Sequence, residues 1–241
     1  IEDGLAMVEQ GADLLDIGGE STRPGAAPVD AAEERRRVLP VVEALAARAG
    51  VPISIDTYKA EVARAAIERG AAIVNDISGL QYDPALAEVV ASSEAALVLM
   101  HMRGRPSDMY REAVYRDVAA EVAAELGARL EAARAAGIAH ARVIVDPGLG
   151  FAKRAEHSWA MLARLDRLAA LDRPVLVGPS RKSFLQAAIG ERPPQARDWA
   201  TAAAVAAAVL GGAHIVRVHE VAGMVDVVRT MERLRRDLAI G

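Results

Sequence analysis

The sequence contains no cysteine among its 241 residues. This absence excludes disulfide bonds and thiolate metal sites. It is typical of proteins in a reducing compartment, so we expect a cytoplasmic protein. The spacings HxH and HExxH are also absent, and no carboxylates are grouped at metal-ligand spacing. We therefore predict no metal cage built from protein side chains.

Two further absences exclude classes of partner. Charged residues make up 26% of the chain with a net charge of −4, and arginines are interspersed with acids, so no nucleic acid is expected as a partner. The longest apolar run, 200–216, is rich in alanine and interrupted by Gly211, Gly212 and His214, so it does not predict a membrane span. A helix that is apolar on all sides is expected in a core or at a subunit interface. With the apolar segment 221–231, it indicates a homodimer, with burial in the core as the alternative.

What the sequence does contain is a series of short, nearly continuous apolar runs separated by amphipathic helical segments. Runs of this kind are typical of strands buried on both faces of a parallel sheet. Seven such runs occur, at 13–19, 52–57, 72–78, 96–101, 143–148, 174–180 and 214–219.

The arrangement of these runs favours a barrel over an open sheet. A doubly wound sheet usually carries a glycine-rich phosphate turn after its first strand, and neither GxGxxG nor GxxxxGK[ST] occurs here. A (β/α)8 TIM barrel needs eight strands and about 250 residues. We therefore predict an α/β fold in which residues 1–241 form one TIM-barrel domain, with the first strand lying before residue 1.

Polar residues gather where the runs end, which in a barrel is the rim that carries the chemistry. Asp56, Asn75 and Asp146 occupy similar positions on three runs. Each one alone is explained equally well as a helix cap. The three together favour a shared ligand, because two carboxylates and an amide suit a flat heterocycle with N–H donors.

A second polar group indicates an anion site. Gly178 opens the segment GPSRKSF at 178–184, and Arg217 and His219 lie two residues apart on the last run, facing the same way. Barrels often bind phosphate between their last two strand-to-helix loops. The alternative is that Arg181 and Arg217 pair with surface acids.

Lysine is scarce, since the chain has only three, at 59, 153 and 182, and each follows the end of a predicted strand. We therefore predict an anionic ligand near Lys182, Arg217 and His219. For His101 two interpretations stay open, a site residue or a buried histidine bonded to a backbone carbonyl. The residue type of Met100 favours the core.

At this point the chain resembles the dihydropteroate synthase family along essentially its whole length. The similarity rests on strings that occur in the family's order: GGESTRPG (18–25), SIDT (54–57), NDISG (75–79), MHMRGRPSDM (100–109), DPGLGFAK (146–153), GPSRKSF (178–184) and RVH (217–219).

The resemblance implies an enzyme that joins 6-hydroxymethyl-7,8-dihydropterin pyrophosphate to p-aminobenzoate, giving 7,8-dihydropteroate and pyrophosphate in folate synthesis. It implies a site for the pterin ring at Asp56, Asn75, Asp146 and Lys182, lined by Met100, Phe151 and Gly178. It places pyrophosphate at Arg217 and His219. It places p-aminobenzoate by the loop residues Thr22, Arg23 and Pro24, with Ser183 and the stem of Lys182. Among these, Lys182, Arg217, His219 and Arg23 are the expected catalytic residues.

One family segment has no counterpart here. The first strand and loop of the family resemble Asn-Val-Thr-Pro-Asp-Ser-Phe and supply an asparagine for the metal, and no such string occurs. The implied Mg²⁺ is therefore expected to be held mainly by the substrate pyrophosphate. Two alternatives stay open: a methyltetrahydrofolate:corrinoid methyltransferase, which shares the pterin mouth, and a catalytically silent paralogue that binds pterin.

The segment DIGGESTRPG (16–25) is expected to end a strand and continue as a loop that closes over the substrates. Arg23→Ala should therefore lower kcat/KM about tenfold or more, because a side chain that contacts the reacting groups is removed. Steady-state kinetics with both substrates check this expectation. Unchanged turnover together with unchanged Michaelis constants would contradict the closing role.

Overall fold

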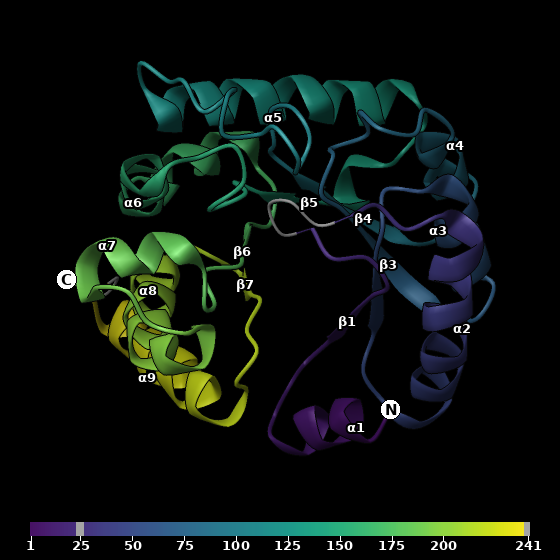
Figure 1. Cartoon of the computed structure of the whole chain (residues 1–241), viewed down its shortest axis with the longest axis horizontal. Helices are drawn as coiled ribbons and strands as arrows, with labels where there is room; N and C mark the ends of the chain where they lie inside the picture. The colour runs from purple at the N-terminus through teal and green to yellow at the C-terminus, as the bar shows by residue number, and fades with distance from the viewer. Residues whose placement is uncertain (23–26, 239–241) are drawn as a thin grey trace.

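In the computed structural model, which describes residues 1–22 and 27–238, parallel strands form a curved inner wall enclosed by helices (Figure 1). The strands are β1 (Leu15–Gly18), β2 (Ile53–Asp56), β3 (Ala71–Asp76), β4 (Ala96–Met100), β5 (Val143–Asp146), β6 (Leu176–Val177) and β7 (Ile215–Val216). The helices are α1 (Glu2–Glu9), α2 (Ala31–Arg48), α3 (Ala60–Ile67), α4 (Ala85–Ala91), α5 (Val118–Ala135), α6 (Ala155–Ala163), α7 (Gln186–Ile189), α8 (Asp198–Leu210) and α9 (Ala222–Leu238).

The strands follow one another around the wall in chain order. Strands β1 to β5 form one parallel sheet, β6 pairs with β7, and an isolated bridge from Val145 to Val175 joins the two sheets. Each of the seven predicted apolar runs overlaps one of these strands, and only β3 begins one residue before its run, so the predicted parallel α/β arrangement is confirmed. Within the described residues β1 pairs only with β2 and β7 only with β6. The eighth strand, expected before residue 1, stays a prediction.

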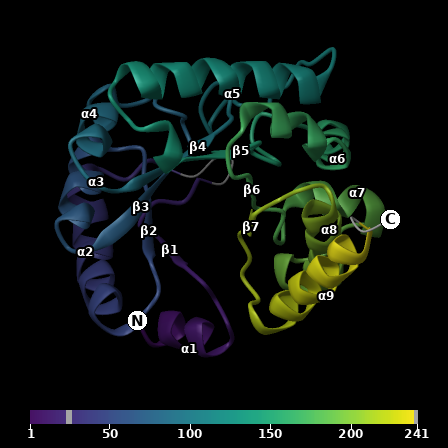
Figure 2. The same cartoon turned by 180° about the vertical axis from the view of Figure 1, so that it is seen from behind.

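Helices cover the outside of the wall, and α2 shows the apolar side at helical spacing that packs against it. In α2 the buried residues include Val38, Val42 and Leu45, which recur every three or four positions. The helix begins where the Asp30 carboxylate accepts the Glu33 N–H at 2.8 Å. The two opposite views show the same enclosure by helices (Figures 1 and 2). The carboxyl end of each strand is followed by a loop, and these loops form the rim of the wall.

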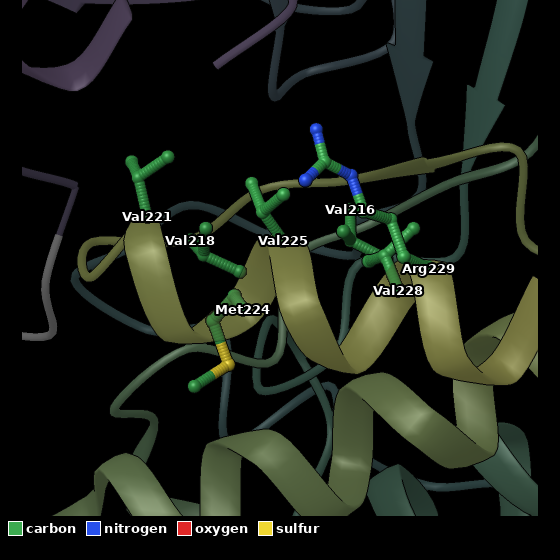
Figure 3. A pocket seen from close by; sticks show the side chains of 7 residues that line it. All are labelled: Val216, Val218, Val221, Met224, Val225, Val228 and Arg229. Carbon is green, nitrogen blue, oxygen red and sulfur yellow. The ribbon is translucent and has the colours of Figure 1, made fainter. Parts of the chain in front are cut away.

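The alanine-rich helix α8 packs against α9. Val205 and Val209 of α8 form a buried cluster with Met224, and Val228 and Met231 pack against it. Core burial thus accounts for these parts of 200–216 and 221–231, while Trp199 stays 91% exposed. A groove between α9 and β7 (Figure 3) is lined by Val216, Val218, Val221, Met224, Val225, Val228 and Arg229, of which Met224 and Val228 also belong to the cluster with α8. None of the described helices has the length and apolar character needed to cross a bilayer.

A tight turn after β5 sets the shape of the rim. Gly148 has a φ of +65°, and a Cβ at this position would lie 2.1 Å from the carbonyl oxygen of His101. Only glycine permits so close an approach of two backbone segments in this conformation. The loop after β5 is therefore packed directly on the end of β4.

We expect Gly148→Ala to lower the free energy of unfolding by about 3 kcal/mol or more, because it adds a backbone clash to an unfavourable φ. Gly50→Ala is the matched control, since Gly50 has a φ of +68° with nothing within 4 Å of the added Cβ. That variant should lose only about 1 kcal/mol. Denaturant unfolding measures both values, and equal losses would contradict the close packing at Gly148.

Candidate active site

The carboxyl ends of β1, β2 and β3 bring an acid cluster together with an arginine from the far end of the chain. Arg217 Nε donates to Asp16 Oδ2 at 2.6 Å, and its Nη2 donates to Asp56 Oδ2 at 3.1 Å. Asn75 Nδ2 donates to the same Asp16 oxygen at 3.0 Å. The strand register explains the meeting, since Gly18 lies beside Asp56 and Asp56 beside Asn75.

Burial shifts the protonation of Asp56. Burial and the charge of Asp16 together raise the pKa of Asp56 to about 7, although Arg217 opposes the shift. The side chain of Asp56 is 16% exposed and that of Asp16 is 9% exposed. Two acids so close together, with little water, favour ligands that supply N–H donors.

Asp146 and Lys182 lie close enough in the mouth of the barrel for each to shift the pKa of the other. Burial raises the pKa of Asp146, while Lys182 opposes that change. Burial likewise lowers the pKa of Lys182 to about 8, opposed by Asp146. The N–H of Gly148 donates to Asp146 Oδ1 at 2.6 Å, which fixes the plane of the carboxylate.

An apolar slot adjoins this pair. The ammonium of Lys182 bonds the carbonyl of Leu149 and lies 4.4 Å from the centre of the Phe151 ring. Phe151 packs against a buried cluster that contains Met100. Gly178 lies near Arg217, since a Cβ on the glycine would contact Arg217 Cβ at 3.7 Å. The structure therefore gathers the predicted slot residues around one mouth.

The last two loops supply the remaining polar groups. His219 Nδ1 lies 2.9 Å from the Ser180 hydroxyl, whose oxygen also accepts the His219 N–H at 3.2 Å. Arg181 pairs with Asp198 at 2.8 Å, as the alternative of pairing with an acid predicted for this residue. Arg217 instead pairs with acids of the mouth. Ser183 is exposed and begins a short 3-10 turn, Ser183–Leu185, directly after Lys182.

The interpretation of His101 as a histidine bonded to a carbonyl needs correction. His101 is fully buried, but its side chain bonds charged groups: Nε2 lies 2.9 Å from Glu125 Oε2, and Nδ1 lies 2.8 Å from Lys153 Nζ. A carboxylate only accepts, so Nε2 carries the proton and Nδ1 accepts from Lys153. Lys153 is 1% exposed, and burial holds its pKa well below the ordinary value. Two charged partners therefore satisfy both ring nitrogens.

The expected closing loop is described only in part. Arg23 and Pro24 lie outside the described residues, and Thr22 is half-buried. Glu20, two residues before Thr22, is anchored: the hydroxyl of Tyr58 donates to its carboxylate at 3.1 Å, and Lys59 bonds both Glu20 and Glu34. The start of the loop is therefore held against the end of β2.

Sequence reasoning missed two positions, Asp16 as part of the site and Lys153 as the partner of His101. For Asp16 the available signal was a carboxylate inside an otherwise apolar run. For Lys153 it was the scarcity of lysine. Within residues 1–22 and 27–238 no group of three or more histidine and acidic side chains could hold a metal ion.

Comparison of the sequence with known proteins shows which family the chain belongs to. A sequence model described as pterin binding enzyme matches residues 1–219. The dihydropteroate synthase of Mycobacterium leprae is 48% identical over 237 residues, covering 96% of this chain and 83% of that protein.

Two solved structures agree over nearly the whole chain. Dihydropteroate synthase from Xanthomonas albilineans with 4-aminobenzoic acid superposes with a TM-score of 0.92 at 44% identity, covering 97% of this chain and 83% of that one. The enzyme from Burkholderia cenocepacia complexed with 7,8-dihydropteroate superposes with a TM-score of 0.91 at 45% identity, covering 100% of this chain and 88% of that one. The fold is therefore that of the pterin-binding TIM-barrel enzymes. Within this class, the chain belongs to the dihydropteroate synthase family.

The buried His101 should make stability depend on pH. Burial and the nearby charge of Lys153 lower the pKa of His101 to about 4, while Glu125 opposes the shift. A histidine with a lowered folded pKa binds more protons when unfolded, so its stability contribution is lost as the pH falls from about 6.5 to about 4. The loss amounts to about 3 kcal/mol.

We therefore expect the stability deficit of His101→Gln to shrink by about that amount as the pH falls from about 7 to about 4. Asp56 titrates in the same range with the opposite sign, but it is present in both proteins and cancels in the difference. Denaturant unfolding at several pH values measures the deficit. A deficit that is independent of pH would contradict a neutral buried His101.

Proposed function

We propose that this chain condenses 6-hydroxymethyl-7,8-dihydropterin pyrophosphate with p-aminobenzoate, giving 7,8-dihydropteroate and pyrophosphate, as a dihydropteroate synthase of folate biosynthesis. One observation carries the proposal: buried acids at the ends of β2 and β5 lie in the same mouth as Lys182 and Arg217. A pterin brings N–H donors to the acids, and its pyrophosphate brings negative charge to the cations.

The acids and the amide would hold the pterin ring. Asp56, Asn75 and Asp146 accept its N–H groups, and a carboxylate such as Asp146 accepts two parallel bonds from an amidine-like edge. Lys182 donates to the ring and, with its aliphatic stem, covers one side of the slot. Met100, Phe151 and Gly178 line that slot.

Arg217 and His219 would hold the pyrophosphate. The bond between the pterin methylene carbon and the pyrophosphate oxygen breaks, and the electron pair leaves with the oxygen. Arg217 and His219 stabilise the negative charge that grows there. The electron-rich reduced pterin delocalises the positive charge left on the methylene carbon. Nitrogen of the neutral arylamine then attacks this carbon, forms the C–N bond and releases a proton to solvent.

The Mg²⁺ ion of this reaction would be coordinated mainly by the pyrophosphate of the substrate. Mg²⁺ prefers phosphate oxygens and water over all-protein cages, and when bound it neutralises charge on the leaving pyrophosphate. The described side chains offer it no cluster of acids and histidines. We therefore propose pyrophosphate as its main ligand.

The arylamine would enter beside the loop after β1. Thr22, Arg23 and Pro24 are proposed to close over it, with Ser183 and the stem of Lys182 framing the other side. The anchoring of Glu20 by Tyr58 and Lys59 supports a loop that moves about a fixed base.

The whole chain is proposed to work as one domain in a cytoplasmic homodimer. Helix α8 buries its valines against α9, yet Trp199 at its start is 91% exposed and Leu210 at its end is 43% exposed. Exposed apolar side chains at both ends of this helix support a subunit contact there. Sedimentation of the Trp199→Ala variant would test this, and an unchanged dimer would argue against the contact.

The function predicts pyrophosphate release that depends on the arylamine. With Mg²⁺ and the pterin pyrophosphate, release should be rapid when p-aminobenzoate is present and slow when it is withheld. Asp146→Asn should lower kcat/KM for the pterin substrate by about 100-fold, because a buried charge-assisted pair of bonds is lost.

Arg134→Gln is the matched control, since Arg134 lies on the exposed side of α5 and pairs there with Glu131. It should release pyrophosphate at the unchanged rate. Pterin binding without release would contradict the synthase function and favour a silent pterin-binding protein.

A further inference from the structure

We propose that Asp16 is a specificity-determining positioning residue, which holds the amide of Asn75 so that its oxygen accepts a ring N–H of the substrate. The proposal rests on the function proposed above, in which Asn75 contacts the pterin ring. It assigns a role to the one carboxylate of the mouth that otherwise has none.

The contacts of Asp16 determine which way the Asn75 amide faces. A carboxylate has no proton to donate when ionised, so the atom of Asn75 that lies 3.0 Å from Asp16 Oδ2 must be the NH2 group. The amide oxygen then occupies the other position. Within the described part of the chain this oxygen accepts no hydrogen bond, so it is available to a ligand. Asn75 is thereby converted from an ambiguous group into an acceptor.

Arg217 fixes the position of Asp16. Its Nε donates to Asp16 Oδ2 at 2.6 Å, a charge-assisted hydrogen bond that holds the carboxylate against rotation. The same guanidinium bonds Asp56 through Nη2 at 3.1 Å. The guanidinium of Arg217 therefore fixes the positions of both Asp16 and Asp56, and Asn75 is hydrogen-bonded to Asp16.

The second oxygen of Asp16 argues against a purely structural role. Asp16 Oδ1 is buried and has no hydrogen-bond partner among the described residues. An unpaired buried acceptor is energetically unfavourable. A residue kept only to support the wall would not need this oxygen. An amide at position 16 would remove the charge, but it would also allow the side-chain amide of Asn75 to rotate so that its oxygen and NH2 group exchange places.

The orientation of Asn75 determines which heterocycles the mouth can bind. With Asp56, Asp146 and the oriented Asn75, the mouth presents acceptors on three strands, so it favours heterocycles whose edge carries N–H donors. A ring that places an acceptor opposite Asn75 meets a buried oxygen and is disfavoured. In the Asp16→Asn variant the Asn75 amide is no longer held in one orientation. The preference for rings with N–H donors over rings with acceptors should therefore weaken.

The test is equilibrium binding of 6-hydroxymethyl-7,8-dihydropterin, without pyrophosphate, to the full chain and three variants. Asp16→Asn should raise the dissociation constant about tenfold or more, since one ring N–H loses its acceptor. Asn75→Asp alone should also bind weakly, because two carboxylates would then face each other.

The double variant Asp16→Asn with Asn75→Asp exchanges donor and acceptor within the pair and restores an oxygen at position 75 toward the ring. The new NH2 group at position 16 also meets Arg217 Nε, which donates to this same atom of Asp16, so the rescue is partial. The dissociation constant of the double variant should lie well below the value expected from adding the two single losses. A structural role for Asp16 predicts no such rescue. Additive losses in the double variant, or unchanged affinity in Asp16→Asn, would overturn the proposal. Failure of the unchanged chain to bind the pterin would instead overturn the proposed function, and the role of Asp16 with it.

Discussion

Burial of acidic side chains at one rim of the strand wall is the constraint on which the rest of the structure depends. Asp56 and Asp146 lie where little water reaches them, and burial raises the pKa of both. Arg217 and Lys182 offset this effect, and Arg217 reaches from the last strand to acids on β1 and β2. A buried carboxylate is tolerated only with donors around it, so the acids require both these cations and a ligand that brings N–H groups. The charges that stabilise the acids of the mouth therefore also define which ligand suits it.

The acids stay in place because the wall beneath them is tied together by buried polar contacts. Arg129 of α5 donates to the carbonyls of Met100 at 2.8 Å and Met102 at 2.6 Å, which fixes the end of β4. His101 then donates its backbone N–H to the carbonyl of Asp146 at 2.8 Å. Lys153 completes the connection by donating to His101 and to the Phe151 carbonyl. Helix α5, the end of β4 and the slot beside Phe151 are thus tied together by hydrogen bonds, and those of His101 and Lys153 are buried from solvent.

The sequence predicted the wall and much of the mouth because the signals for both are local. Strands buried on two faces read as continuous apolar runs, and Asp56 and Asp146 stand where such runs end. The role of Asp16 was not predictable in this way, since it depends on a register beside Ser54 and on an arginine 201 residues away. For His101 a site residue and a buried histidine bonded to a carbonyl were both open; its partners come from α5 and from the loop after β5, and no spacing in the chain encodes their meeting. Arg23 and Pro24 lie outside the described residues, and their closing role stays a prediction.

The most direct test of the account is the number of protons released when the pterin ring binds. Burial holds Asp56 partly protonated near neutral pH, and ring N–H donors favour its ionised form, so binding must lower its pKa. Calorimetric titration of 6-hydroxymethyl-7,8-dihydropterin at about pH 6, in buffers of different ionisation enthalpy, measures the release. We expect more than about half a proton to leave per ring bound, and less at about pH 8, where Asp56 is already ionised. Binding that releases no proton at the lower pH would contradict the central role of the buried acids.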